Sequence, residues 1–292
     1  MRPQSGLSFA DHVWMYQTEG WRQTRLAAII YSLTPERVGS VRSARLIDSD
    51  HLVPMYDALL AISGASVDMY RVLMNSSWWD RVFREDPEHY YQVRLPDVPR
   101  PGTDYYHTLF AVPEHIWEGA SERGVNQPPD LKGLRFDPAA PPGGSPTSEV
   151  VIDYPEWGPE QTWRYDRAGG RWLSWTEMQL EQEGREQTPD IDLLTGEQLA
   201  FDNVVIIWAE HYWAPDFAQV PSLGVEMVGE GEAVLLRDGL RYEITWRRDD
   251  PERLIQFFDR SGEVIPFRPG QTWFHVASTE TTGYPPTVQF VP

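Results

Sequence analysis

The chain has 292 residues, of which 41% are hydrophobic and 24% charged, a balance typical of a folded globular protein. Lys and Arg number 25 against 44 Asp and Glu, and the resulting net charge of −19 argues against nucleic acid or an anionic membrane surface as the main partner. Cysteine is absent, which excludes disulfides, a thiol nucleophile, Cys-ligated zinc and a lipid-modified cysteine within these residues.

The first part of the chain predicts a mixture of strands and helices. Runs of β-branched and aromatic residues favour strands, and apolar residues at helical spacing favour helices. Asp48 and Pro113 each suit the first turn of a helix. The expected strands are residues 11–17, 27–33 and 58–63, and the expected helices are residues 48–56, 66–83 and 113–121.

A proline- and glycine-rich segment at residues 126–149 separates this part from the next. Proline removes backbone donors and glycine resists order, so the composition predicts a linker or a long surface loop.

The second part predicts strands and turns, with Asp238-Gly239 as the strongest hairpin signal. The acidic segment 177–192 is expected to be solvated, and the tail at 278–292 is expected to be extended. The expected strands are residues 150–154, 162–165, 171–175, 203–213, 232–237, 240–246, 254–258, 263–266 and 272–276.

The expected fold is therefore α+β. A mixed α/β N-terminal domain is expected at residues 1–137, a Pro/Gly linker at 138–149, and a β-rich C-terminal domain at 150–292. Residues 1–6 lack the basic and apolar regions of a signal peptide, and no run of about 18 apolar residues predicts a transmembrane segment.

Standard catalytic motifs are missing from the sequence. There is no phosphate-binding glycine loop, no Gly-x-Ser-x-Gly elbow, no His-Glu-x-x-His and no calcium loop. The Glu114-His115 and Glu210-His211 pairs lack a third ligand at metal-binding spacing, and His211 is expected to be a half-buried strand residue. We therefore expect no metal and no cofactor.

One segment, residues 38–50, differs from the acidic background. It presents Arg42, Ser43 and Arg45 just before the expected helix that starts near Asp48. A guanidinium pairs bidentately with carboxylate or phosphate, and a helix N-terminus adds N–H donors, so the segment predicts an anion-binding site. The alternative is that the arginines pair with neighbouring acids and tie the loop down. A nucleophilic Ser43 is disfavoured because no base stands beside it in sequence.

Two further polar clusters accompany this segment. Glu19 and Arg25 lie in a charged stretch that joins two expected strands, and a hairpin loop is the default there. His107 follows a proline-rich loop among aromatic residues, where a structural histidine is favoured over a catalytic one.

The order and spacing of several short strings resemble the DUF3048 family nearly from end to end. The strings in the first part are residues 2–7, 10–11, 19–20, 24–25, 41–45 and 56–58, and those in the second part are residues 195–199, 203–205, 229–233 and 269–273.

The resemblance implies two linked domains of unknown biochemical activity in an exported bacterial protein, membrane-anchored upstream of the folded part. The chain starts inside the family pattern and lacks a lipobox cysteine. It departs from the pattern at Met15, where relatives have an acid, and at Thr108 and Phe110, where relatives have Asn and Tyr. Both departures lower the expectation of catalysis.

Three functions stay open. The first is an extracytoplasmic, envelope-associated protein that binds a small polar or anionic ligand, such as a cell-wall fragment, in a cleft of the N-terminal domain. The second is a hydrolase of envelope glycan or peptide, in which Glu19 or Asp48 is the acid or base and His107 assists. The third is a scaffold that binds an envelope protein through the β-rich domain. The expected ligand-binding residues are Glu19, Arg25, Arg42, Ser43, Arg45, Asp48 and His107.

Overall fold

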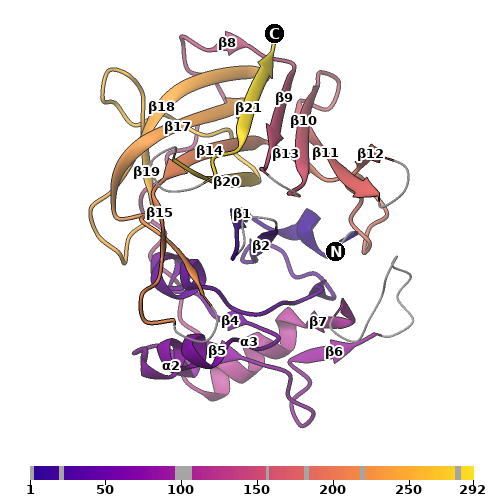
Figure 1. Cartoon of the computed structure of the whole chain (residues 1–292), viewed down its shortest axis with the longest axis vertical. Coiled ribbons are helices and arrows are strands. Elements are labelled where there is room, and N and C mark those ends of the chain that lie inside the picture. Colours follow the sequence, from indigo (N-terminus) through magenta and orange to yellow (C-terminus); the bar gives the residue numbers. More distant parts are fainter. Residues whose placement is uncertain are drawn as a thin grey trace.

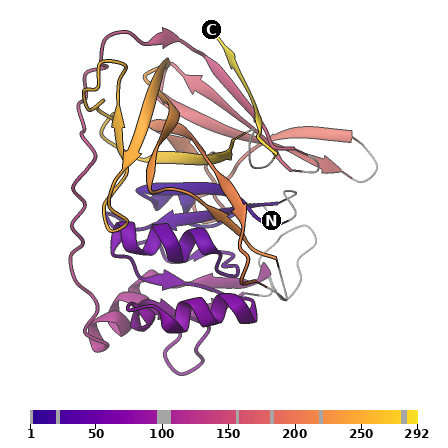
Figure 2. The same ribbon diagram turned by 60° about the vertical axis from the view of Figure 1, so that its left-hand side comes forward.

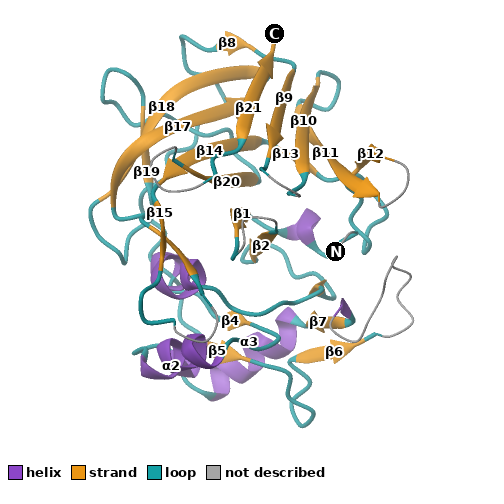
Figure 3. Ribbon diagram, viewed as in Figure 1, coloured by secondary structure: helices purple, strands orange, loops and turns teal. Residues whose placement is uncertain are grey.

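The computed structural model describes residues 3–19, 23–95, 107–155, 158–180, 184–217, 221–279 and 284–292. Two sheets lie above a layer of helices and short strands that comes from the first part of the chain (Figure 1, Figure 2). Strands dominate over helices (Figure 3), which confirms the expected α+β class with a strong excess of sheet.

The larger sheet combines strands from both ends of the chain. In spatial order it contains β19 (Gln256–Phe258), β18 (Leu240–Arg248), β17 (Gly229–Arg237), β14 (Asn203–Ala209), β20 (Thr272–Ser278), β1 (His12–Gln17) and β2 (Thr24–Ile29), with β8 (Ser145–Pro146) paired to β18.

The second sheet is antiparallel and packs on one face of the first. It contains β12 (Gly184–Pro189), β11 (Arg171–Leu180), β10 (Glu160–Asp166), β9 (Glu149–Asp153) and β21 (Thr287–Val291), with β13 (Ala200–Phe201) paired to β11. A separate ribbon joins β15 (His211–Trp213) to β16 (Leu223–Val225).

The lower layer holds the helices. One turn of π-helix, η2 (Asp48–Leu52), runs into α1 (Val53–Tyr56), and two longer helices follow, α2 (Val67–Asn75) and α3 (Pro113–Glu122). Short 3-10 turns, η1 (Leu7–Phe9) and η3 (Trp79–Arg81), lie before β1 and after α2. The strands here are β3 (Val38–Gly39), β7 (Leu109–Ala111) and β6 (Gln92–Arg94), which form one small sheet, and β4 (Leu60–Ala61) with β5 (Val82–Phe83).

Strand β1 holds the two parts of the chain together. It pairs parallel with β20 on one side and antiparallel with β2 on the other. Successive side chains of a strand point to opposite faces, and both faces of β1 are buried. Trp14 and Tyr16 join the core beneath the sheet, where Trp14 stacks on Phe274 at 4.1 Å, while Val13 and Met15 join the core shared with the second sheet.

The pairing of β1 with β20 crosses the boundary expected at residues 138–149. The N-terminal hairpin is part of a sheet whose other strands lie beyond that boundary. The division into two domains therefore stays a prediction.

Several element boundaries differ from the sequence-based expectation. The helix expected at 66–83 ends at Asn75, because Ser76 is extended and its hydroxyl donates to the carbonyl of Leu73 at 2.6 Å. The strand expected at 27–33 is β2, shifted toward the N-terminus by its register with β1. The strand expected at 203–213 splits at Glu210 into β14 and β15, which belong to different sheets.

The acidic segment 177–192 is not solvated throughout. Asp190 and Asp192 are only 5% and 1% exposed. Asp192 accepts the backbone N–H groups of Gly6 and Ser8, each at 2.8 Å, and thereby fastens the N-terminal turn to the second sheet. Burial of these acids is possible because each has hydrogen-bond donors around it. Within the tail, Thr287–Val291 is extended as expected, since it forms β21 and pairs with β9; residues 280–283 lie outside the described residues.

The contact between Trp14 and Phe274 predicts a large effect of shortening Trp14. Trp14→Ala should lower the free energy of unfolding by about 3 to 5 kcal/mol, because it removes a buried indole and leaves a cavity. Trp213→Ala removes an indole that is 49% exposed, and should cost less than about 1 kcal/mol. Urea denaturation of the two variants measures the difference, and equal losses would contradict a structural role for β1.

Candidate functional site

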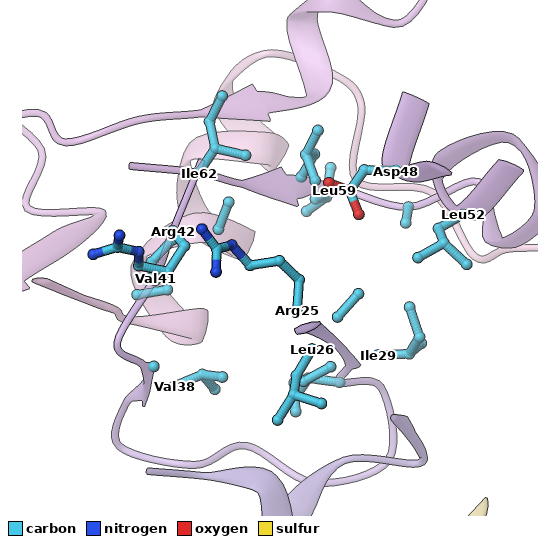
Figure 4. Close-up of a pocket in the computed structure, with 18 of the residues that line it drawn as sticks. Arg25, Leu26, Ile29, Val38, Val41, Arg42, Asp48, Leu52, Leu59 and Ile62 are labelled. Atoms are coloured by element: carbon cyan, nitrogen blue, oxygen red, sulfur yellow. The ribbon is translucent and has the colours of Figure 1, made fainter. Parts of the chain in front are cut away.

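A cleft of about 1440 Å³ opens between β2 and the lower layer. Its upper wall is β2, and the facing walls are residues 38–43, residues 56–62 and helix α3 (Figure 4). Glu177 of the second sheet, with Gly158 and Pro159 just before β10, lines one side. Five of the seven residues expected to bind ligand line this cleft, namely Arg25, Arg42, Ser43, Asp48 and His107.

Arg25 points from β2 into the cleft toward Arg42 (Figure 4). Its Nε is buried, and among the described residues no hydrogen bond or ion pair joins its guanidinium to a partner. Burial lowers the pKa of Arg25, and the positive charges of Arg45 and Arg42 lower it further. The charge of Arg25 is repelled by the nearby charges of Arg42 and Arg45, which destabilises the free protein.

The backbone of Arg42 is held on both sides. The N–H of the preceding Val41 donates to the carbonyl of Leu109 at 2.8 Å, and the carbonyl of Arg42 accepts the N–H of Ser63 at 3.1 Å. These bonds fix the segment between β7 and the residues that follow β4. The position of Arg42 on the cleft wall is therefore set by the small sheets of the lower layer.

Asp48 lies at the base of the cleft. Its Oδ1 accepts the Tyr16 hydroxyl at 2.8 Å and its Oδ2 accepts the N–H of Arg45 at 2.7 Å. Burial raises the pKa of Asp48 to about 6, although these bonds and the charges of Arg45 and Arg25 act in the opposite direction. Burial and the Asp48 charge raise the pKa of Tyr16 well above its ordinary value, so Tyr16 keeps its proton and acts as a donor.

Glu19 and Arg45 do not line the cleft but pair with each other beside it. Arg45 Nε donates to Glu19 Oε2 at 2.8 Å, and Ser222 Oγ donates to Glu19 Oε1 at 3.2 Å. Arg45 also donates to the carbonyls of Ser43 and Ala44, at 3.2 and 2.9 Å. Both side chains line a smaller cavity of about 190 Å³. Arg45 therefore ties its loop down, as the alternative hypothesis for the arginines states.

Ser43 lines both cavities, and His107 lines the large one. No hydrogen bond between described residues joins the Ser43 hydroxyl to a base.

Sequence reasoning missed four aromatic residues of the cleft, namely Tyr16, Tyr31, Tyr56 and Trp117. The signal for Tyr16 was available, since a hairpin around residues 18–23 places it directly opposite Arg25. Trp14 Nε1 donates a hydrogen bond to the Tyr56 hydroxyl oxygen over 2.9 Å, a contact that depends on how α1 packs under the sheet. No sequence pattern indicated that contact.

The described part of the chain lacks two features that mark other protein classes. None of its helices combines the length and the apolar character needed to cross a membrane. Within the same residues, no group of three or more His, Asp or Glu side chains is arranged to hold a metal ion.

Comparisons with known proteins agree with the sequence resemblance. Residues 1–126 match the N-terminal domain and residues 150–274 the C-terminal domain of a family described as "Protein of unknown function (DUF3048)". The chain is 25% identical over 296 residues to the Bacillus subtilis protein named "Putative lipoprotein YerB", a match that covers 94% of this chain and 77% of the relative.

A solved structure shares the fold. The crystal structure of the YerB protein from Bacillus subtilis superposes with a TM-score of 0.74 at 23% identity, covering 99% of this chain and 89% of the other. Because the two family matches together span most of the sequence, the chain belongs to the DUF3048 family.

Proposed function

We propose that this protein is associated with the bacterial cell envelope and binds a polar, anionic ligand in the cleft below β2. The envelope location is supported by the relative named as a lipoprotein. The ligand class is supported by the charges of the cleft. A carboxylate or phosphate of the ligand pairs with Arg25 and Arg42, and the aromatic rings of the walls contact the rest.

The unpartnered guanidinium of Arg25 is the observation on which this proposal depends. A half-buried cation beside other cations costs free energy unless an anion joins it. Glu19 attracts Arg25, but its two oxygens already accept hydrogens from Arg45 and Ser222. No carboxylate among the described residues pairs with Arg25, and an anionic ligand would supply that counter-charge.

A hydrolase is the second candidate, and the raised pKa of Asp48 favours it. A carboxyl that titrates near pH 6 can serve as a general acid. Glycan cleavage also needs a second carboxyl about 5 to 9.5 Å away across the bond. Glu19, the expected partner, pairs with Arg45 in the smaller cavity, which weakens this candidate. Release of product from peptidoglycan by the wild type, and not by Asp48→Asn, would establish it.

The scaffold hypothesis is supported less well. It depends on an apolar patch in the β-rich part and on the lack of a deep pocket elsewhere. Tyr212 and Trp213 are exposed by 42% and 49%, yet a large cleft exists below β2.

The anion-binding proposal predicts opposite effects of removing Arg25 on stability and on binding. Arg25→Met keeps the volume of the side chain and removes the repelled cation, so it should raise the thermal midpoint of the free protein. The same change should abolish the ligand response. In the wild type, a ligand at about 100 times its Kd adds about 2.7 kcal/mol, which raises the midpoint by roughly 5 to 10 °C.

The measurement is thermal unfolding with muramyl dipeptide, glycerol 3-phosphate and the neutral sugar N-acetylglucosamine. Arg42→Gln should lose the response to the anions, whereas Arg247→Gln, a surface variant of equal charge change, should keep it. Arg45→Ala should destabilise the free protein, because it breaks the tie to Glu19. The proposal fails if no anion shifts the wild type, or if Arg25→Met responds as the wild type does.

The buried carboxyl of Asp48 predicts a specific pH dependence of stability. An unfolded Asp titrates near pH 3.9, whereas Asp48 titrates near 6 in the folded protein. Between these values the folded state binds the proton more tightly, so stability falls as the pH rises. At about 1.4 kcal/mol per pKa unit, the wild type should lose roughly 3 kcal/mol relative to Asp48→Asn between about pH 4 and pH 7. Urea denaturation across this range measures the loss, and parallel pH profiles of the two proteins would contradict it.

A further inference from the structure

The edge of the larger sheet lies inside the cleft. Strand β2 is the last strand of the sheet, and among the described residues only β1 pairs with it. Consecutive residues from Gln23 to Tyr31 line the cleft. The side chains of β2 pack partly on the two cores, and its outer edge borders the open space. Such an edge presents unpaired backbone donors and acceptors, which are a template for another strand.

The register identifies which backbone groups are unpaired. The N–H of Thr18 donates to the carbonyl of Gln23, so this pair belongs to the hydrogen-bonded set of the β1–β2 ladder. Bonded and non-bonded pairs alternate along an antiparallel ladder. Arg25 and Ala27 therefore direct their N–H and C=O groups toward β1, and Leu26 and Ala28 direct theirs into the cleft.

A second contact gives the same alternation from the other side of β1. The carbonyl of Asp11 accepts the N–H of Thr272 in β20, so the odd-numbered residues of β1 face β20. Val13 and Met15 thus bond to β20, and their opposite residues in β2, Ala28 and Leu26, have no partner there. No described group makes a backbone hydrogen bond with Leu26 or Ala28 on the cleft side.

We propose that the cleft binds an extended peptide that adds as a strand to the free edge of β2, with a carboxylate of that peptide at Arg25 and Arg42. This proposal rests on the anion site proposed above and names the class of its ligand. Arg25 lies near the start of β2. A peptide whose C-terminal carboxylate reaches Arg25 therefore runs antiparallel to β2, the direction that pairs most favourably.

The dimensions and the lining of the cleft suit this occupant. Its volume of about 1440 Å³ exceeds the roughly 300 to 1,000 Å³ of sites for small molecules, and so accommodates several residues of a chain. The wall that faces β2 offers the apolar side chains of Val38, Val41 and Leu59, which can contact alternate side chains of an added strand.

A second copy of this protein is a poorer occupant of the edge. Pairing β2 with β2 of another molecule would bring together two chains that each have a net charge of −19. It would also leave the arginines at the end of the strand without a ligand carboxylate.

The test uses a pool of fluorescein-labelled hexapeptides, randomised in sequence and free at the C-terminus, captured by the full chain. The best-retained sequence is then made with a C-terminal amide and with backbone N-methyl groups on one or the other alternate set of residues. We expect one N-methylated set to lose binding at least tenfold and the other to bind as the parent does, because only alternate N–H groups face β2. The C-terminal amide should also bind at least tenfold more weakly, unless the sequence supplies the carboxylate from a side chain.

Variants of Ala28 provide the matched test in the protein. Ala28→Pro removes the N–H on the cleft side but no bond to β1, and proline is tolerated at a sheet edge, so the fold should survive. The affinity of Ala28→Pro for the peptide should be at least tenfold lower than that of the wild type. Ala28→Ser keeps the N–H and should bind the peptide as the wild type does. Amide hydrogen exchange at Leu26 and Ala28 should slow when peptide binds, with no change at Ala27. If Ala28→Pro does not fold, the binding of the N-methylated peptides to the wild type still tests strand addition.

The outcomes separate this proposal from the anion site. Loss of the anion response in Arg25→Met, together with equal binding of both N-methylated sets, would leave the anion site intact and overturn strand addition. Strand addition would also be overturned if the wild type retained no more peptide than Ala28→Pro does. A wild-type dimer that protects the amides of Leu26 and Ala28 from exchange without peptide would overturn it as well. Failure of both the anions and the peptides to bind would overturn the two proposals together.

Discussion

The pairing of β1 with β20 is the interaction on which the rest of the structure depends. It places β1, the first strand of the chain, beside β20, which comes last in sequence among the strands of the larger sheet. It also buries both faces of β1 between two cores. The hairpin that follows adds β2 as the outermost strand. The edge of the sheet and the arginine on that edge, which form one wall of the cleft, follow from this parallel contact.

The cleft holds one cation, Arg25, that has no counter-charge among the described residues of a strongly acidic chain. Arg45 has its carboxylate in Glu19, and Asp48 is enclosed by Tyr16 and the backbone of Arg45. These pairings leave Arg25 without a counter-charge among the described residues. A site that binds an anion tightly must hold such a cation ready, and the free protein loses stability for it. Arg42 and Arg45 are only three residues apart, yet Arg42 lines the cleft and Arg45 pairs with Glu19 beside it.

Both regions matched by the DUF3048 family contribute to the cleft. Its main walls come from residues 1–126, and Gly158, Pro159 and Glu177 from the other region close one side. The similarity to the YerB crystal structure extends over 99% of the chain, so the relative has the same arrangement of sheets.

The sequence by itself determined the α+β class, the family, the main hairpins and the helices at Val53–Tyr56 and Pro113–Glu122, because turn residues, helix-starting residues and alternation act locally. It also pointed to five residues that line the cleft. Only the tertiary structure decided that β1 joins β20, that Glu19 takes Arg45 away from the cleft, that Asp48 is buried, and that Tyr16 stands over it. Each of these depends on contacts between distant segments, and no local pattern of residues specifies which strand becomes a neighbour or which carboxylate is removed from water.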